Sequence, residues 1–376
     1  MNPHVMVVFG TRPEAIKVAP VVRRLRADRS IDTTVVDTGQ HAGLLEPVYA
    51  TFDFDPDERL DVAVPGQDLT ALATRTMTAV GAVIARRRPD LVLVHGDTSA
   101  AAVTALAAHY AHVEVAHLEA GLRSADLWSP WPEEANRRVI GQLASVHFAP
   151  TQRAADRLLA EGADPAAVHV TGNTVIDALL HTLDTTAPPL PVPVQAALDA
   201  GRRLVLVTGH RRESWESGLA DTAAGIADTV RDRDDVFVWA PLHPNPIVRA
   251  AIEPAFAGLD HVLVDAPLDH PTFCRAMQVA HCIVTDSGGV QEEAPTLGTP
   301  VLVTRDTTER PEALEAGASR LIGTDRAVVR AELAALLDDD DDRCRAMGRA
   351  VNPYGDGRAA ERVHEVVRAV LGNRAA

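Results

Sequence analysis

Short apolar runs alternate with longer amphipathic stretches along almost the whole chain, and this alternation restricts the fold more than any other feature. Short apolar runs bounded by turn residues are typical of buried strands, and the stretches between them have helical spacing. Strands that alternate with helices favour parallel pairing through right-handed crossovers. We therefore predict an α/β protein with doubly wound parallel sheets. The expected strands are His4–Phe9, Thr33–Asp37, Leu91–His95, Val113–His117, Val146–Ala149 and Val168–Thr171 in the first half, and Arg203–Thr208, Val236–Ala240, Val262–Val264, Cys282–Thr285 and Val301–Thr304 in the second.

The chain has 376 residues, which is more than one ordinary hydrophobic core accommodates, so we expect two domains. Residues 185–194, TTAPPLPVPV, contain four prolines and no periodicity, a composition typical of a semi-rigid linker. We predict a Rossmann-like domain over residues 1–184 and a second over residues 195–354. The final segment, residues 355–376, is predicted to form a helix that packs back on the first domain.

Composition argues against several classes of function. The net charge of −16 argues against nucleic-acid binding through a broad basic face. No apolar run reaches the ~18 residues of a membrane-spanning helix, and the N-terminus lacks the features of a signal peptide. Cys274, Cys282 and Cys344 show no CxxC spacing, so neither a disulfide framework nor a zinc site is indicated. We expect a cytoplasmic protein without a metal and without membrane association.

The loop after the first predicted strand has the residues of an anion site. Thr11 and Glu14 have the spacing of a capping box, and Pro13 fits the first turn of a helix. Arg12 and Lys17 would then lie near a helix N-terminus, where anions bind readily. Lys17 is the only lysine in a chain with 36 basic residues, which hints that this position requires a compact ammonium group. A plain strand-to-helix turn is the alternative.

Carboxylates follow the next strands of the first half. Asp97 and Glu119 come after consecutive predicted strands, and Glu133 follows soon afterwards, next to Glu134. Because consecutive parallel strands end at the same edge of a sheet, we expect Asp97 and Glu119 to lie near each other. Neighbouring carboxylates can divide the roles of acid and base. The alternative is a helix cap at Asp97 and surface ion pairs at the glutamates.

The second half carries signals for a nucleotide. His210 stands next to Arg211 after a predicted strand, an arrangement that suits an anion better than a core. In the sequence Ser287-Gly288-Gly289, small residues let the backbone approach a pyrophosphate at the start of a helix. Glu293, one turn further on, could accept hydrogen bonds from ribose hydroxyls or simply complement the helix dipole. Residue spacing therefore indicates a nucleotide-linked substrate and acid–base chemistry.

A family resemblance makes this hypothesis specific. The segments FGTRPEAIKVAP, GDT, EAGLR, SPWPEEANR, TGNTVIDALL, TGHRRES, TDSGGVQEEAP, RDTTERPEA and NPYGDG resemble those of the non-hydrolysing UDP-N-acetylglucosamine 2-epimerases, in the expected order from about residue 5 to residue 357. The resemblance implies two Rossmann-like domains that face each other across a cleft, as in the glycosyltransferase-B fold. It also implies a homodimer, no metal or nicotinamide cofactor, and interconversion of UDP-N-acetylglucosamine (UDP-GlcNAc) and UDP-N-acetylmannosamine (UDP-ManNAc) through 2-acetamidoglucal and UDP.

The resemblance also assigns roles to residues. Those implied for acid–base chemistry are Asp97, Glu119 and Glu133, with His210 beside the departing phosphate. Those implied to contact UDP or the sugar are Arg12, Lys17, Phe273, Ser287, Gly288, Gly289, Glu293 and Arg310.

Many relatives bind a second UDP-GlcNAc as an activator, and the matching positions here are Gln40, His41, Glu134, Arg211 and His243. The chain departs from that pattern at two positions, where Gly43 replaces a glutamine and Gly66 falls near an expected arginine. A requirement for an activator is therefore left open.

Two other activities remain as alternatives. A hydrolysing relative would release N-acetylmannosamine (ManNAc) and UDP, whereas a glycosyltransferase of the same fold would need an acceptor. A sensor that binds a UDP-sugar without turnover is a further alternative.

Overall fold

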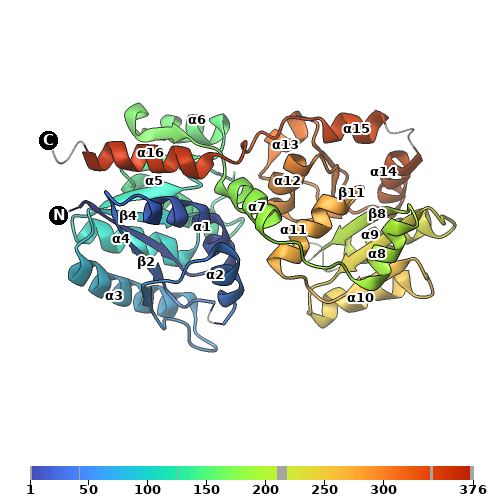
Figure 1. Ribbon diagram of the computed structural model, residues 1–376, viewed down its shortest axis with the longest axis horizontal. Helices are drawn as coiled ribbons and strands as arrows, with labels where there is room; N and C mark the ends of the chain where they lie inside the picture. The colour runs from blue at the N-terminus through green and yellow to red at the C-terminus, as the bar shows by residue number, and fades with distance from the viewer. Residues whose placement is uncertain (1, 42, 125, 210–217, 339–341, 373–376) are drawn as a thin grey trace. The chain divides into compact units, whose positions relative to one another are not determined.

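The computed structural model describes residues 2–41, 43–124, 126–209, 218–338 and 342–372 (Figure 1). The chain divides into two compact units, and the first is built from two separate stretches. Unit 1 comprises Met1–His181 and Tyr354–Ala376, and unit 2 comprises Thr182–Pro353. Within the described ranges, no helix combines the length and the apolar character needed to cross a membrane.

In the described part of unit 1, the strands form a seven-stranded parallel sheet in the order β3-β2-β1-β4-β5-β6-β7. The strands are β1 (His4–Phe9), β2 (Asp32–Asp37), β3 (Glu58–Arg59), β4 (Leu91–His95), β5 (Glu114–Leu118), β6 (Val146–Ala149) and β7 (Val168–Val170). The helices of unit 1 are α1 (Arg12–Ala27), α2 (Glu46–Phe52), α3 (Leu69–Arg87), α4 (Ser99–Tyr110), α5 (Glu133–Leu143), α6 (Gln152–Ala160) and α16 (Ala359–Gly372), together with α7 (Thr174–Thr185), which continues into unit 2.

Helices cover both faces of this sheet because alternate side chains of each strand point to opposite sides. Val5 and Val7 of β1 pack in one core with apolar residues of α1, α2 and α16. Met6 and Val8 pack in a second core with residues of α3 and α4. Both faces of β1 are therefore buried, which explains its continuous apolar run.

Helix α16 belongs to unit 1 although unit 2 precedes it in the sequence. It lies against α1, and its apolar face contributes Ala360, Val363, Val367 and Leu371 to the core (Figure 1). The predicted helix at the C-terminus is thus present and packs within the first unit.

In the described part of unit 2, the strands form a six-stranded parallel sheet in the order β10-β9-β8-β11-β12-β13. They are β8 (Arg203–Thr208), β9 (Val236–Pro241), β10 (Val262–Asp265), β11 (Cys282–Thr285), β12 (Val301–Val303) and β13 (Ser319–Leu321). The helices are α8 (Val192–Asp199), α9 (Gly218–Val230), α10 (Pro246–Phe256), α11 (His270–Val279), α12 (Gly288–Glu293), α13 (Pro311–Glu315), α14 (Arg326–Asp338) and α15 (Asp342–Gly348). A core built from α9, α10 and α14 covers one face.

Each sheet has a Rossmann strand order, and the prediction of a doubly wound α/β fold is confirmed. In such sheets the strand order reverses direction at one place, where ligands bind beyond the carboxyl ends of the strands. This switch point lies between β1 and β4 in unit 1 and between β8 and β11 in unit 2.

The predicted linker needs a correction at its C-terminal end. Helix α8 begins at Val192, so residues 192–194 are helical rather than part of a spacer. Pro193 lies in the first turn of α8, where its missing N–H leaves no intrahelical hydrogen bond unmade. The boundary between the units falls earlier, between His181 and Thr182 inside α7.

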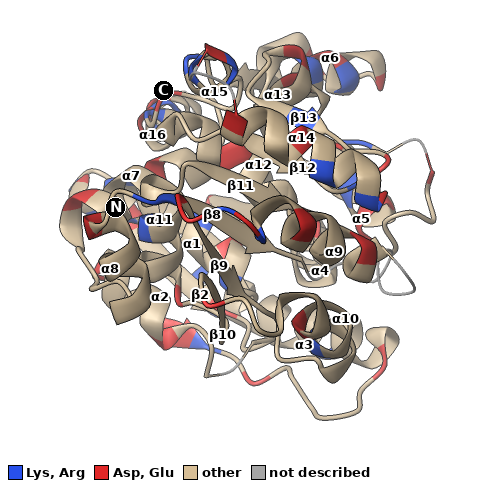
Figure 2. Ribbon diagram, turned by 90° about the vertical axis from the view of Figure 1, so that its right-hand side faces the viewer, with Lys and Arg blue, Asp and Glu red and all other residues tan. Residues whose placement is uncertain are grey.

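Acidic and basic residues are intermixed along the helices, as Figure 2 shows for one view. This distribution agrees with a chain whose negative net charge is spread over many surface positions.

Candidate active site

The switch point of unit 1 is held together by a buried carboxylate. Glu14 Oε2 accepts hydrogen bonds from the backbone N–H groups of Gly10 and Thr11 at 3.0 and 2.8 Å. Its Oε1 accepts a bond of 2.7 Å from the hydroxyl of Thr98. The expected capping box at the start of α1 is confirmed. The Thr11 hydroxyl also donates to Oε2, at 2.9 Å. Burial raises the pKa of Glu14, and these four hydrogen bonds oppose that shift. Glu14 thus ties the loop that carries Arg12 to the residue after Asp97.

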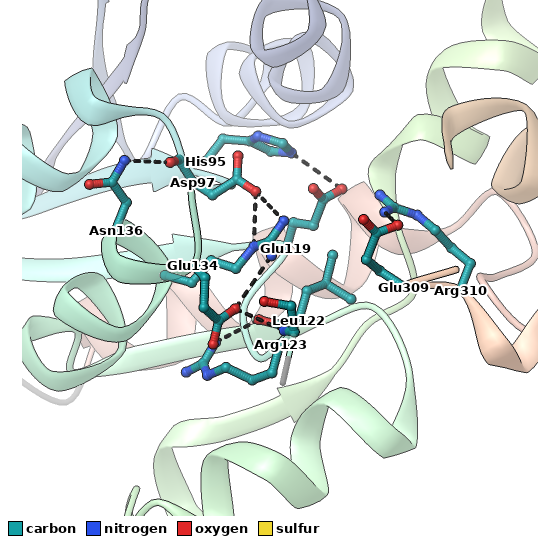
Figure 3. Close-up of polar contacts among 12 residues, drawn as sticks. His95, Asp97, Glu119, Leu122, Arg123, Glu134, Asn136, Glu309 and Arg310 are labelled. Atoms are coloured by element: carbon teal, nitrogen blue, oxygen red, sulfur yellow. Dashed lines mark hydrogen bonds and ion pairs between the residues drawn. The ribbon is translucent and has the colours of Figure 1, made fainter. Parts of the chain in front are cut away.

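Asp97 follows β4 and is fixed by two residues of α5. Arg137 donates from Nε and Nη2 to the same oxygen, Oδ2 of Asp97, at 2.9 and 2.5 Å. The side-chain amide of Asn136 donates to the backbone carbonyl of Asp97 at 2.8 Å. Figure 3 shows these contacts around Asp97. The other oxygen, Oδ1, is left facing away from these bonds, and the Asp97 side chain stays 25% exposed.

Glu119 follows β5 and has a left-handed backbone conformation, with φ of +60°. Such a conformation is costly for a residue other than glycine and is found often at functional sites. Glu119 Oε2 accepts from Lys17 Nζ at 2.5 Å and from the side-chain amide of Asn173 at 2.7 Å. Lys17 is therefore paired with Glu119, a contact that the sequence did not predict, and both side chains are largely buried.

His95, the last residue of β4, lies close to Glu119. His95 Nε2 is 3.9 Å from Glu119 Oε2, and neither ring nitrogen of His95 has a hydrogen-bond partner among the described residues. Burial lowers the pKa of His95 to about 4, although the charge of Glu119 opposes the shift. The imidazole is therefore neutral at neutral pH and places no positive charge beside Glu119.

The two glutamates that open α5 differ in their surroundings. Glu133 is partly exposed, and its Oε2 is buried without a hydrogen-bond partner among the described residues. Glu134 is fully buried and accepts from the backbone N–H of Ser124 at 2.9 Å and from Arg138 Nε at 2.9 Å. Glu134 thus stabilises the start of α5, whereas Glu133 has an oxygen available for a ligand.

The switch point of unit 2 lies at the end of β11. The N–H of Ser287 donates to Thr285 Oγ1 at 3.0 Å, and Gly288 begins α12. A Cβ built on Gly288 would meet Cζ of Arg310 at 3.0 Å, so glycine lets the guanidinium lie against this backbone without a shift. A Cβ on Gly289 would meet Glu293 Oε2 at 3.4 Å, which brings Glu293 next to the same loop.

Arg310 is oriented by acidic neighbours. Its Nε donates to Glu292 Oε1 at 2.9 Å, and its Nη1 lies 3.5 Å from Glu309 Oε2. Burial alone would raise the pKa of Glu309, but the hydrogen bond from Arg305 and the charge of Arg310 lower it to about 2. Unit 2 therefore offers a glycine-rich turn with a positioned guanidinium, a combination that suits phosphate oxygens.

The remaining predicted residues are more scattered. Phe273 is half-buried in α11. His210 and Arg211 lie outside the described residues. Among the positions assigned to an activator, Gln40 and His41 follow β2, and His41 Nδ1 lies 3.4 Å from the backbone nitrogen of Arg12. His243 is exposed before α10, and the carboxylate of Glu134 already has protein partners.

Sequence reasoning left several residues of this site without a role. Arg137 and Asn173 stand in the quoted segments SPWPEEANR and TGNTVIDALL, but their partners Asp97 and Glu119 are 40 and 54 residues away. His95 precedes the quoted GDT segment. The family resemblance covers these segments, but it does not predict which side chain each residue contacts. The structure shows those contacts.

Lys17 forms an ion pair with Glu119, and Arg137 forms one with Asp97. The described residues include no group of three or more histidine, cysteine or acidic side chains arranged to hold a metal ion.

Two doubly wound units, each with polar loops at its switch point, define a protein of the glycosyltransferase-B class. A family model described as UDP-N-acetylglucosamine 2-epimerase matches residues 23–368. The chain therefore belongs to the UDP-N-acetylglucosamine 2-epimerase family, and the resemblance seen in the sequence is confirmed.

Individual relatives agree over their whole length. A probable UDP-N-acetylglucosamine 2-epimerase of Ralstonia nicotianae is 50% identical over 375 residues, covering 97% of this chain and 98% of the relative. The UDP-N-acetylglucosamine 2-epimerase of Escherichia coli is 44% identical over 369 residues, covering 97% and 98%. The crystal structure of the Neisseria meningitidis enzyme bound to UDP-GlcNAc matches with a TM-score of 0.89 and 38% identity, covering 97% of this chain and 100% of that one.

Proposed function

We propose that this chain interconverts UDP-GlcNAc and UDP-ManNAc by eliminating UDP and adding it back. The observation that carries the proposal is a set of three acids in unit 1, Asp97, Glu119 and Glu133. Asp97 is bound by Arg137, Glu119 is bound by Lys17, and Glu133 is the first residue of α5. A relative of 38% identity binds UDP-GlcNAc, which supports the same substrate here.

The chemistry explains why several acids are useful. The hydrogen at C2 of the sugar has no neighbouring carbonyl to acidify it, so its direct removal as a proton would leave an unstabilised carbanion. In the proposed elimination, a base takes the C2 proton while the C1–O bond breaks and its electron pair leaves with UDP. The product is 2-acetamidoglucal, a planar alkene. Protonation of C2 from the opposite face and attack of the UDP oxygen on C1 complete the inversion.

Two of the three acids are held in place by neighbouring side chains. Asp97 is ion-paired with Arg137 through one oxygen, and Glu119 is bound by Lys17 and Asn173 through one oxygen. Groups held in this way lose little entropy when the substrate aligns with them. We leave open which acid removes and which delivers the C2 proton.

We assign the nucleotide to unit 2. Ser287, Gly288 and Gly289 would give the pyrophosphate a close backbone approach, and Arg310 beside Gly288 would supply a positive charge. Glu293 would accept from the ribose, and Phe273 would lie near the uracil. Arg12 and Lys17 of unit 1, together with His210, complete the proposed substrate contacts.

An activator is not required in this proposal. Gly43 and Gly66 have φ of +78° and +74°, and a Cβ at either position would meet nothing within 4 Å. The two positions therefore offer no side chain to a second nucleotide sugar. We also expect a homodimer, which sedimentation velocity would detect.

The test is incubation with UDP-GlcNAc in D2O without an acceptor. UDP-ManNAc carrying deuterium at C2 is the expected product, and its formation without a lag would support independence from an activator. Free ManNAc with UDP as the only products would instead indicate the hydrolysing reaction. Turnover only after addition of an acceptor sugar would indicate a glycosyltransferase.

A further inference from the structure

Asn173 occupies a position where three parts of unit 1 meet. It stands between β7 and α7 and is 2% exposed. Its side-chain N–H donates to Glu119 Oε2 at 2.7 Å, and its side-chain oxygen accepts from the backbone N–H of Val175 at 3.1 Å. Its own backbone N–H donates to the carbonyl of Tyr354 at 2.7 Å. One residue therefore contacts a candidate catalytic acid, the start of α7 and the C-terminal segment.

One connection between the units follows Asn173 within α7, and the other is hydrogen-bonded to it. Going forward, the chain leaves unit 1 after His181, within α7, the helix that the Asn173 side chain caps. On its return, the chain enters unit 1 at Tyr354, the residue whose carbonyl receives the Asn173 N–H. A displacement of the returning connection would thus reach Asn173 through its hydrogen bond to Tyr354, and a displacement of α7 would reach it through the cap at Val175.

The two backbone segments approach each other too closely for a larger residue. Gly172 has φ of +87°, and a Cβ at this position would meet the Tyr354 carbonyl oxygen at 3.2 Å and Gly355 Cα at 3.3 Å. Glycine at position 172 therefore permits the contact that fixes the backbone of Asn173.

The Asn173 amide and the Lys17 ammonium make different kinds of interaction with Glu119. The ammonium neutralises the carboxylate and can donate in several directions. The amide adds a directed hydrogen bond without adding charge. Since both bind Oε2, they fix the position of that oxygen, and the directed bond from the amide restricts rotation of the carboxylate about it.

We propose that Asn173 is a positioning residue that orients the Glu119 carboxylate for proton transfer at C2 and links that orientation to both connections between the units. The inference rests on the proposed function, in which Glu119 takes part in that transfer.

The first variants replace the amide and keep the helix cap. Asn173→Ser keeps an oxygen for the α7 cap and loses the N–H that reaches Glu119. We expect kcat to fall by about 10- to 100-fold, with KM for UDP-GlcNAc within about threefold of wild type, because misorientation of a reacting group slows chemistry more than binding. The matched control is Asn245→Ser, since Asn245 caps α10 through Ile247 at 3.0 Å. It should leave kcat unchanged.

Asn173→Asp separates a positioning role from a merely structural one through its pH profile. At neutral pH the new carboxylate would face Glu119 Oε2 and repel it, so activity should be lower than in Asn173→Ser. When protonated, the new acid can donate as the amide does. Relative to wild type, activity should therefore recover by about tenfold as the pH falls from 8 to 5.5. A profile of unchanged shape would overturn the positioning role.

The link to the connections is tested with Gly172→Ala, which pushes on the Tyr354 segment and leaves the amide of Asn173 in place. We expect kcat to fall with unchanged affinity for UDP in calorimetry. If this variant does not fold, Gly355→Ala displaces the same contact from the other side. Wild-type kcat in a folded variant would refute the link.

These results can be told apart from failure of the proposed function. If wild-type protein does not convert UDP-GlcNAc with deuterium incorporation, the proposed function is wrong. If wild type converts it and Asn173→Ser keeps wild-type kcat, only the inference about Asn173 is wrong.

Discussion

Arg137 contacts Asp97 with two of its guanidinium nitrogens, and both donate to one carboxylate oxygen. Arg137 itself is buried, and its third nitrogen, Nη1, lies 3.5 Å from Glu134 Oε2. A guanidinium between two acids is fixed in orientation, so it holds Asp97 in one rotamer. Helix α5 thus sets the geometry at the end of β4.

Arg137→Lys should lower kcat by about 10- to 100-fold, since a lysine offers a point charge in place of two fixed donors. Steady-state kinetics with UDP-GlcNAc measures the loss, and circular dichroism checks that the fold is retained. The control is Arg138→Lys, because Arg138 is exposed and contacts only the Glu134 side of this network in the described structure. Equal activity of the two variants would show that the contact with Asp97 is dispensable.

Lys17→Arg tests whether the pair with Glu119 requires a compact cation. The 2.5 Å contact lies between side chains that are 14% and 8% exposed, which leaves little room for a planar guanidinium. We expect kcat to fall by about tenfold or more, with a larger loss in Lys17→Met because the charge is also removed. Wild-type kinetics of Lys17→Arg would show that the lone lysine has no functional meaning.

Gly288→Ala should weaken UDP binding. The new methyl group would press against the Arg310 guanidinium and move it away from the turn. We expect the Kd for UDP to rise by about tenfold or more, as expected when one charged hydrogen bond is lost. Calorimetry measures this change, and Gly81→Ala is the control because a Cβ at Gly81 in α3 meets nothing within 4 Å. Unchanged affinity of Gly288→Ala would place the phosphates elsewhere.

We expect the free energy of unfolding to decrease at acidic pH, because the buried histidines take up protons when the chain unfolds. Burial and the nearby Arg123 lower the pKa of His147 in β6 to about 4, below the unfolded value of 6.5. The unfolded chain therefore binds more protons between these values, and the stabilisation present above pH 6.5 is lost as the pH falls through 4.

Each such group contributes a slope of up to about 1.4 kcal/mol per pH unit in this window. His95 and His117, whose pKa values burial lowers to about 4 and about 3, act in the same direction. His147→Gln should reduce the slope of unfolding free energy against pH, measured by urea denaturation between pH 4.5 and 7. A slope equal to that of wild type would contradict a neutral His147 in the folded state.

The fold could be predicted from the sequence because the apolar residues show both strand and helix patterns clearly. Strands such as Leu91–His95 and Cys282–Thr285 are buried on both sides and have the predicted bounds. The two-residue strand Glu58–Arg59 was missed, since a short strand at the sheet edge has no apolar run. The start of α8 was missed because prolines in a first helical turn resemble a linker in sequence.

The candidate site was predictable only as a set of isolated residues. Asp97 and Glu119 could be assigned to one sheet edge because their strands are consecutive. The partners that orient them, Arg137 and Asn173, come from elements far along the chain, and local patterns do not encode such pairings. Gly288 was read as freedom for a ligand, and the structure adds that it also makes room for Arg310.

Helix α16 completes the core of unit 1 with residues that follow unit 2 in the sequence, including Val363 and Leu371. During synthesis the first unit therefore remains without part of its core until helix α16 has been made. Unit 2, which is continuous in sequence, can fold before that moment. Unit 2 can thus complete its core before unit 1 does, and a premature stop that spares unit 2 entirely would still damage the carboxylate-bearing unit.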